Sequence, residues 1–471
     1  MKSAGVRSSG STCGQKPGEA DDRTVQPTKE TSASTKNWGI AMPTSLWAIA
    51  DKARESKQHR FGGLARLLTA ENLKRSFNLL KKRAAPGVDK VTWQEYRHDL
   101  DGKAKGLEQR LKANQYRAGL VRRKYIPKPN GKRRPLGILR IEDKMLQRAG
   151  TSILEAIYEE DFLDCSYSYR PKRGARDAVR AVTRQLQFGR FRWVVEADIK
   201  GFYDHIEHDK LMAMLSERIQ DGRFLRLIRK WLKAGILEED GQVIDPVTGT
   251  PQGGIVSPVL ANIYLHKVLD QWFEQQIKPG CRGQVMINRY ADDFICAFED
   301  KQDAQRFLKE LAGRLAEYGL ELAPEKTRML RFSRFEVTDN ESFEYLGFEF
   351  RWGRSQRGTA VVKRRTSRTK LRASVAKFTE WIKSKRHSST REIMNTMASK
   401  LRGHWNYYGV IGNQASQWEF FWQIKRILFK WLNRRSQRSS YTWTALADLF
   451  KRYAVPAPCI TEPAPAGSGK G

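Results

Sequence analysis

Two aspartate-bearing segments, far apart in the sequence, constrain the fold of this chain more than any other feature. The run Arg192–Ala197 predicts a buried strand that ends at Asp198. Val285–Arg289 and Phe294–Phe298 predict two strands around the turn Tyr290-Ala291-Asp292-Asp293. Strand ends and tight turns project side chains in fixed directions. The three aspartates can therefore converge at one edge of a sheet.

Carboxylates that converge in this way suit the chemistry of phosphodiester synthesis. That reaction can use two divalent ions about 3.5–4 Å apart, and Mg²⁺ prefers oxygen ligands such as carboxylates. Each motif also has a simpler interpretation, because Asp-Asp is common in turns and an Asp after a strand often caps a helix. The occurrence of both motifs in one basic chain favours the metal site.

The charge of the chain indicates a polyanionic partner. Of its 471 residues, 86 are Lys or Arg and 52 are Asp or Glu, which gives a net charge of +34. A chain this basic repels itself unless a polyanion neutralises it, and nucleic acid gains affinity through counterion release. A ribosome-associated or membrane-surface protein is the alternative. Acidic motifs within basic surroundings favour an enzyme that acts on nucleic acid.

The cysteines and the hydropathy pattern point to the cytoplasm. The cysteines number five, and none forms a C-x-x-C pair, so neither a disulfide framework nor a zinc ribbon is expected. No apolar run has the length of a membrane span. We expect a cytoplasmic protein with no membrane partner. In a bacterium, it would lie in the cytoplasm or the nucleoid.

Periodicity and turn residues predict the remaining elements. Asn130-Gly131 lies between two short strands and is a strong hairpin signal. A capping threonine, Thr69, precedes a helical pattern. The expected elements are helices over Thr69–Lys82, Glu142–Tyr158, residues 223–237 and Ala304–Tyr318, a hairpin over Arg122–Ile138, and a strand over Phe343–Trp352.

The motifs, taken in order, resemble those of the group II intron reverse transcriptase–maturase family. Tyr290–Asp293 looks like its YxDD box, Asp198–Tyr203 like its first aspartate motif, and Thr250–Pro258 like its glutamine motif. Further matches are Ala85–Asp89, Lys128 and Arg134 in the fingers hairpin, Ser168–Pro171, Gly319–Thr327, Tyr345–Phe348 and Leu401–Gly409. The resemblance covers roughly residues 40 to 455.

The resemblance implies an α+β right-hand polymerase with a helical, basic thumb. Composition also predicts disordered ends, because the first residues contain almost no large apolar side chains and the tail is rich in Pro, Ala and Gly. The expected domains are a disordered leader (1–37), fingers with an N-terminal extension (38–190), a palm with the aspartates (191–355), a thumb or maturase domain that binds RNA (356–455) and a disordered tail (456–471).

The resemblance also implies roles for individual residues. Asp198, Asp292 and Asp293 would be catalytic and, with the Ile199 carbonyl, would hold two Mg²⁺ ions, for which Mn²⁺ can substitute. The nucleotide would contact Lys128, Arg134, Tyr203 and Gln252, with Tyr203 blocking a ribose 2′-OH. Primer, template or intron RNA would contact Lys326, Arg364, Arg365, Arg368, Lys370 and Arg372. A generic RNA-binding hairpin and a merely solvated basic helix are the alternatives for the cations.

The function implied is that of an RNA-directed DNA polymerase that binds its intron RNA, assists splicing and copies the intron into DNA. Its partners would be intron RNA, an RNA template with a DNA primer, target DNA and deoxynucleoside triphosphates. Two alternatives stay open: an RNA-binding splicing cofactor with little polymerase activity, and a domesticated reverse transcriptase used in defence or diversification. Many relatives end in a zinc-bearing endonuclease. The absence of paired cysteines and clustered histidines after Tyr453 predicts none here.

Overall fold

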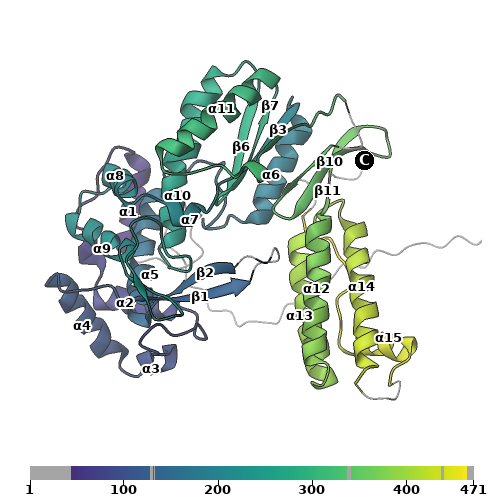
Figure 1. Cartoon of the computed structure of the whole chain (residues 1–471), viewed down its shortest axis with the longest axis horizontal. Coiled ribbons are helices and arrows are strands. Elements are labelled where there is room, and N and C mark those ends of the chain that lie inside the picture. The colour runs from purple at the N-terminus through teal and green to yellow at the C-terminus, as the bar shows by residue number, and fades with distance from the viewer. Residues whose placement is uncertain (1–43, 128–130, 132, 337–340, 436–439, 464–471) are drawn as a thin grey trace, which may run out of the picture.

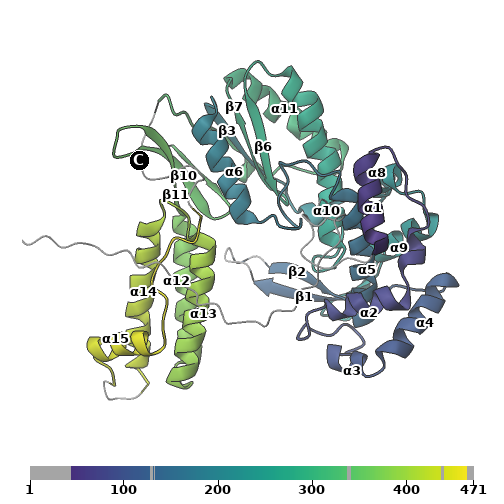
Figure 2. The ribbon, with the colours of Figure 1, turned by 180° about the vertical axis from the view of Figure 1, so that it is seen from behind.

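The structure is a computed structural model that describes residues 44–127, 131, 133–336, 341–435 and 440–463. Figures 1 and 2 show a palm sheet at the top of the molecule, a helical fingers region on one side and a bundle of long helices on the other. The expected leader and Lys128 lie outside the described residues. No helix in the described part is long and apolar enough to span a membrane.

The fingers are helical and carry one projecting hairpin. Thr69 caps α2 by accepting a hydrogen bond from the Asn72 amide, and Leu73 and Phe77 bury its apolar face, so the predicted helix is confirmed but ends earlier. In both views the hairpin points toward the thumb helices (Figures 1 and 2). The elements are α1 (Thr44–Glu55), α2 (Ala70–Asn78), α3 (Trp93–Arg97), α4 (Leu100–Lys112), β1 (Val121–Pro127), β2 (Arg133–Ile138) and α5 (Ile141–Tyr158).

The palm is a four-stranded antiparallel sheet in the order β6-β7-β3-β8. The three strands β3, β6 and β7 are largely apolar and mostly buried, which confirms the strands predicted before Asp198 and on both sides of the Asp292-Asp293 turn. The strands are β3 (Trp193–Asp198), β6 (Val285–Tyr290), β7 (Asp293–Phe298) and β8 (Arg328–Arg331). The helices are α6 (Ala175–Phe188), α7 (Phe202–His205), α8 (His208–Arg218), α9 (Gly222–Leu232), α10 (Ser257–Leu265), continued by η2 (His266–Asp270), and α11 (Lys301–Glu317).

Three further predicted boundaries differ from those in the structure. The helix expected over 223–237 ends at Leu232, and β4 (Ile236–Leu237) then joins the hairpin sheet beside β5 (Val243–Ile244). The strand expected over 343–352 is divided by Leu346 and Gly347, whose φ angles of 50° and 80° form a turn. The palm–thumb boundary at 355 falls inside a sheet of β9 (Ser342–Tyr345), β10 (Phe348–Arg354) and β11 (Ala360–Thr366).

The thumb consists of three long helices and a short one. They pack through buried apolar residues such as Leu401, Trp405 and Leu428, and Figure 1 shows the long helices side by side. They are α12 (Arg368–Lys385), α13 (Thr390–Tyr408), α14 (Gln414–Leu432) and α15 (Trp443–Arg452).

The tail expected to be disordered from residue 456 contacts the thumb along its described part. The Trp405 indole donates to the Pro456 carbonyl at 3.1 Å, and the Glu462 amide donates to the Gly409 carbonyl at 2.9 Å. Glu462 is 9% exposed and accepts two hydrogen bonds from Arg364. The start predicted for the disordered tail was therefore wrong.

His404 makes the thumb sensitive to acid. Its ring stacks on Phe420 with centroids 3.9 Å apart, and burial lowers its pKa from 6.5 to about 4. In the unfolded chain, His404 binds a proton as the pH falls below 6.5. In the folded chain, it binds that proton only near pH 4. The contribution of neutral His404 to the free energy of unfolding is therefore fully present above pH 6.5, and it is lost as the pH falls toward 4. We expect amide exchange in α13 to accelerate between pH 7 and 5 after correction for intrinsic rates. A His404→Phe variant should show no such acceleration, and an equal one would contradict this assignment.

Candidate functional site

The three predicted aspartates lie together at one edge of the palm sheet. In the antiparallel β3–β7 pair Asp198 stands opposite Asp293, and in the β6–β7 hairpin Tyr290 stands opposite Asp293. Ala291 and Asp292 form the two-residue connection of that hairpin. We call Tyr290–Asp293 the aspartate turn. The predicted convergence of segments far apart in sequence is thus present in the fold.

The backbone of the aspartate turn adopts an uncommon conformation. Ala291 has a φ of 58°, a left-handed value that costs a residue with a side chain about 1–2 kcal/mol. Its amide donates to the Ser168 Oγ at 2.7 Å, and its carbonyl accepts from Arg289 at 3.2 Å. These contacts hold the turn in a conformation that its own sequence does not favour.

The electrostatics of the turn indicate a shortage of positive charge. Burial, followed by the charges of Asp292 and Asp198, raises the pKa of Asp293 from 3.8 to about 7. Burial and the Asp198 carboxylate also raise the pKa of Asp292, whereas the cations of Arg134 and Lys326 act against that rise. A cation that binds among such crowded carboxylates stabilises their ionised form.

Lys326 currently supplies one such cation. Its ammonium donates to the Asp198 Oδ2, and this contact raises the pKa of Lys326. The segment before it is fastened to the end of β3, because the Ala323 amide donates to the Asp198 carbonyl at 2.9 Å and the Lys200 amide to the Glu321 carbonyl at 2.8 Å. The sequence placed Lys326 near the primer. The structure puts it in the carboxylate cluster itself.

The donor set fits divalent ions in chemistry, although its side chains are not arranged around one. Among the described residues, no three His, Cys, Asp or Glu side chains form a ready metal site. Ile199 pairs with Leu322 in an antiparallel bridge whose hydrogen bonds come from residues 198 and 200. Its own carbonyl therefore faces away from that segment, toward the β7 side. Carboxylate and carbonyl oxygens are the ligands that Mg²⁺ favours.

Three elements meet beside the aspartates. The Thr250 amide donates to the Tyr203 carbonyl at 2.8 Å, and the Gly137 amide of β2 donates to the Gln252 carbonyl at 2.6 Å. Gly253 has a φ of 111°, and a Cβ there would lie 2.6 Å from the Gly137 carbonyl oxygen. Glycine is thus required for the close approach. The structure brings Tyr203, the Gln252 loop and the fingers hairpin together, as the motifs predicted.

Two of the predicted nucleotide contacts can be located further. The Tyr203 hydroxyl donates to the Tyr169 hydroxyl at 3.2 Å, and Tyr169 is 51% exposed. Arg134 is exposed on β2, and its charge opposes the rise in the pKa of Asp292 that burial causes. This hairpin cation therefore acts electrostatically on the aspartate turn.

The cations predicted to contact RNA fall into two groups. Arg368, Lys370 and Arg372 are exposed on the first turns of α12, and the charge of Lys370 opposes the rise in the pKa of Asp293 that burial and the neighbouring carboxylates cause. Arg364 and Arg365 lie on β11 instead, and alternation along this strand turns Arg364 inward. It is 6% exposed and ion-paired with Glu462 at 2.8 Å. We no longer expect Arg364 to contact RNA.

Arg365 is half-buried and donates to both carboxylate oxygens of Glu349. Its guanidinium already has a partner, so it too is a weaker candidate for phosphate than the cations of α12.

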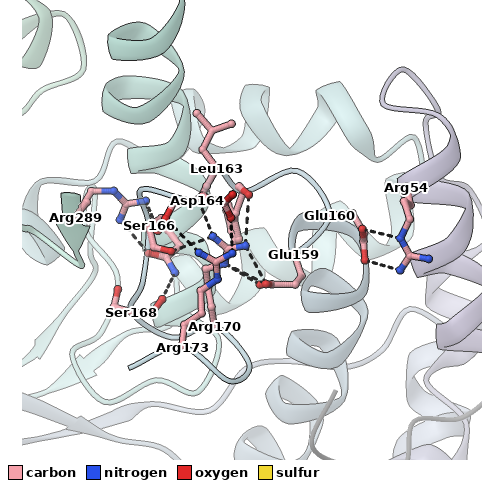
Figure 3. A network of polar contacts seen from close by, with 12 residues as sticks. Arg54, Glu159, Glu160, Leu163, Asp164, Ser166, Ser168, Arg170, Arg173 and Arg289 are labelled. Atoms are coloured by element: carbon pink, nitrogen blue, oxygen red, sulfur yellow. Dashed lines mark hydrogen bonds and ion pairs between the residues drawn. The ribbon is translucent and has the colours of Figure 1, made fainter. Parts of the chain in front are cut away.

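Sequence reasoning missed a polar cluster behind the aspartate turn. Arg289 and Asp270 are both 0% exposed and form an ion pair. Figure 3 shows Arg289 directed toward Ser166, beside Ser168 and the neighbouring Arg170–Glu159 pair. The available signal was a charged residue inside each of two apolar runs. Lys, Arg, Asp and Glu are almost never fully buried unless they are paired.

Comparisons with known proteins agree with this geometry. The family model described as reverse transcriptase (RNA-dependent DNA polymerase) matches residues 126–350. The group II intron-encoded protein LtrA of Lactococcus lactis subsp. cremoris is 32% identical, over 66% of this chain and 64% of that protein. Protein YkfC of Escherichia coli (strain K12) is 33% identical, over 62% of this chain and 83% of that protein. The chain thus spans less than two thirds of the length of LtrA.

Two further likenesses are shorter or more distant. An uncharacterized 91 kDa protein in the cob intron of Schizosaccharomyces pombe is 46% identical, over 35% of this chain and 20% of that protein. A truncated apo telomerase from Candida Tropicalis, at 14% identity, has a TM-score of 0.40 over 50% of this chain and 54% of that chain. This score is too low to bear on the fold.

Proposed function

Because the chain belongs to the group II intron-encoded reverse transcriptase and maturase family, we propose that it is an RNA-directed DNA polymerase that binds its intron RNA, assists splicing and copies the intron into DNA. The observation that carries this proposal is the register of β3 and β7. It sets Asp198 opposite Asp293, the residue that follows Asp292 in the turn. We infer that the protein acts in the cytoplasm, because its cysteines lack paired spacing. In a bacterium, this place would be the cytoplasm or the nucleoid.

Asp198, Asp292 and Asp293, with the Ile199 carbonyl, would hold two magnesium ions. When bound, the ions activate the primer 3′ oxygen and stabilise the charge of the leaving pyrophosphate. The raised pKa values of Asp292 and Asp293 support this assignment, because they reveal carboxylates that lack sufficient positive charge. Lys326 would exchange its contact with Asp198 for a phosphate or the primer end. Arg134 would stabilise the triphosphate from the hairpin.

Tyr203 would select deoxynucleotides by excluding a 2′-hydroxyl, while Gln252 positions the nucleotide. Given an RNA template, a DNA primer and Mg²⁺, the protein should extend the primer with deoxynucleotides and use ribonucleotides about 100-fold less efficiently. A Tyr203→Val variant should lose most of that difference. The Tyr203→Phe variant keeps the ring and serves as its matched control. Absence of DNA synthesis by the unaltered protein would end the proposal. Equal discrimination in all three proteins would remove only the role of Tyr203.

The exposed cations of α12 would contact the phosphates of RNA. Each neutralised phosphate contributes about 0.7 to the logarithmic salt dependence of binding to a single strand. Replacing three such cations by glutamine should therefore reduce that slope by about 2. The residues are Arg368, Lys370 and Arg372. A control triple replacement on α11, which lies at the top of the molecule in both views and apart from α12, uses Lys301, Arg306 and Lys309. Equal slopes for the two variants, measured by filter binding, would contradict the role of α12.

A further inference from the structure

Arg289 lies two residues before Ala291, and every hydrogen-bond donor of its guanidinium has a partner. Its Nε and one Nη donate to the Asp270 carboxylate at 2.7 and 2.5 Å. The remaining donors reach the Ser166 Oγ at 2.8 Å, the Asn262 Oδ1 at 3.1 Å and the Ala291 carbonyl at 3.2 Å. All five N–H groups of a guanidinium are thereby used. Such a set fixes the side chain in one position.

The same cluster holds the other polar group of Ala291. The Ala291 amide donates to the Ser168 Oγ at 2.7 Å, and the Ser168 carbonyl accepts from the Asn262 side chain at 2.7 Å. Asn262 thus links Ser168 to Arg289, so the amide and the carbonyl of Ala291 are held by one connected cluster. The members of this cluster are 0–1% exposed: Ser166, Ser168, Asn262, Asp270 and Arg289.

Both contacts act on the residue with the strained backbone. Ala291 has a left-handed φ of 58°, and its conformation sets the direction in which the next residue, Asp292, leaves the turn. Asp270 is the last residue of η2 (His266–Asp270), which continues α10, and Asn262 lies within α10. The cluster therefore ties the turn to a rigid helix that is buried behind the sheet.

We propose that Arg289, oriented by Asp270, is a positioning residue for polymerisation that holds the aspartate turn in its productive conformation. The inference rests on the proposed function of the turn. Groups that orient metal-binding residues from behind typically contribute 10–100-fold to activity or metal affinity, roughly what we expect here. A lysine cannot take over this role, because its ammonium has three donors and no rigid fork.

The competing interpretation is that the ion pair only stabilises the core. A double variant, Arg289→Met with Asp270→Leu, separates the two, because a buried ion pair can often be replaced by apolar residues of similar volume without loss of stability. We expect the double variant to melt within about 5 °C of the unaltered protein and to bind RNA normally. Its maximal rate of single-nucleotide incorporation should fall about 10–100-fold, and the magnesium concentration for half-maximal rate should rise. The half-saturating deoxynucleotide concentration should change less than about threefold, since the residues proposed to hold the nucleotide are unaltered.

A matched control removes another buried ion pair that lies away from the turn. Arg218 and Asp161 are 8% and 13% exposed and pair at 2.8 Å, and Arg218 also donates to carbonyls of the segment after α1. The double variant Arg218→Met with Asp161→Leu should incorporate nucleotides at a rate within about threefold of the unaltered protein. Equal rates in the two double variants would overturn the proposal.

A milder variant decides the question if the first double variant does not fold. Ser168→Ala leaves the Arg289–Asp270 pair intact and removes only the acceptor of the Ala291 amide. We expect it to lower the maximal rate about tenfold, with the same small effect on nucleotide saturation. An unchanged rate and magnesium dependence would refute the positioning role. If the unaltered protein makes no DNA at all, the proposed function fails instead, and the two failures are distinguished.

Discussion

Replacing Asp292 by alanine should reduce primer extension by about 10³-fold or more, while RNA binding stays within about twofold. Asp292 occupies the second position of the two-residue connection between β6 and β7, where its carboxylate meets the charges of Asp198 and Arg134. Without it, the site loses the negative charge that would hold a divalent ion between β3 and the turn. The thumb cations proposed to bind RNA lie on α12 and are not altered by the change.

The control for this experiment is a surface aspartate. Asp209 on α8 is 87% exposed in its side chain and pairs with Arg229 at 2.9 Å, so Asp209→Ala should leave extension unchanged within about twofold. The measurement is single-nucleotide addition to a DNA primer on an RNA template, at saturating magnesium. Asp292→Asn preserves side-chain size and should be as inactive as the alanine variant. Substantial extension by either variant would show that the aspartate turn is not the polymerising centre.

The strands that carry the aspartates could be predicted because each is an apolar run bounded by polar residues. The prediction for β3 began one residue early, and β7 differs from its prediction only by including Asp293. Their mutual register could not be derived from periodicity, since it depends on which strands become neighbours. The order of motifs supplied that information through resemblance to a family.

What the sequence did not reveal depends on partners far along the chain. Nothing in the sequence distinguishes Arg364 from Arg368. In the structure, however, Arg364 points inward from β11 and pairs with Glu462, which lies 98 residues later in the chain. The break at Leu346 was not predicted because leucine rarely adopts its φ of 50°; Gly347 inside the expected strand was the local signal for it. The role of Arg289 was missed for the same reason as that of Arg364, because its partners come from two other segments: the helix that carries Asn262 and Asp270, and the loop that carries Ser166. Charged residues in apolar runs should therefore be examined as members of possible buried pairs.

Two neighbouring arginines, Arg170 and Arg173, provide the sharpest test of that reasoning. Arg170 and Arg173 each pair with a carboxylate (Figure 3), but their surroundings differ. The Arg170 and Glu159 side chains are 3% and 9% exposed, whereas those of Arg173 and Asp164 are 27% and 95% exposed. Arg170 also donates to the carbonyls of Leu163 and Ser166.

Arg170→Met should lower the free energy of unfolding by about 3–5 kcal/mol, because it leaves a buried carboxylate and two carbonyls without their partner. Burial already raises the pKa of Glu159 despite the arginine beside it, so without Arg170 this residue should take up a proton and recover part of the loss. Arg173→Met should cost no more than about 1 kcal/mol, since solvent screens its pair. Both losses of stability can be measured by urea unfolding of the full chain, with hydrogen exchange in α5 and β6 as the probe. Similar losses for the two variants would mean that burial does not decide the contribution of these ion pairs, and the same objection would then apply to Arg289.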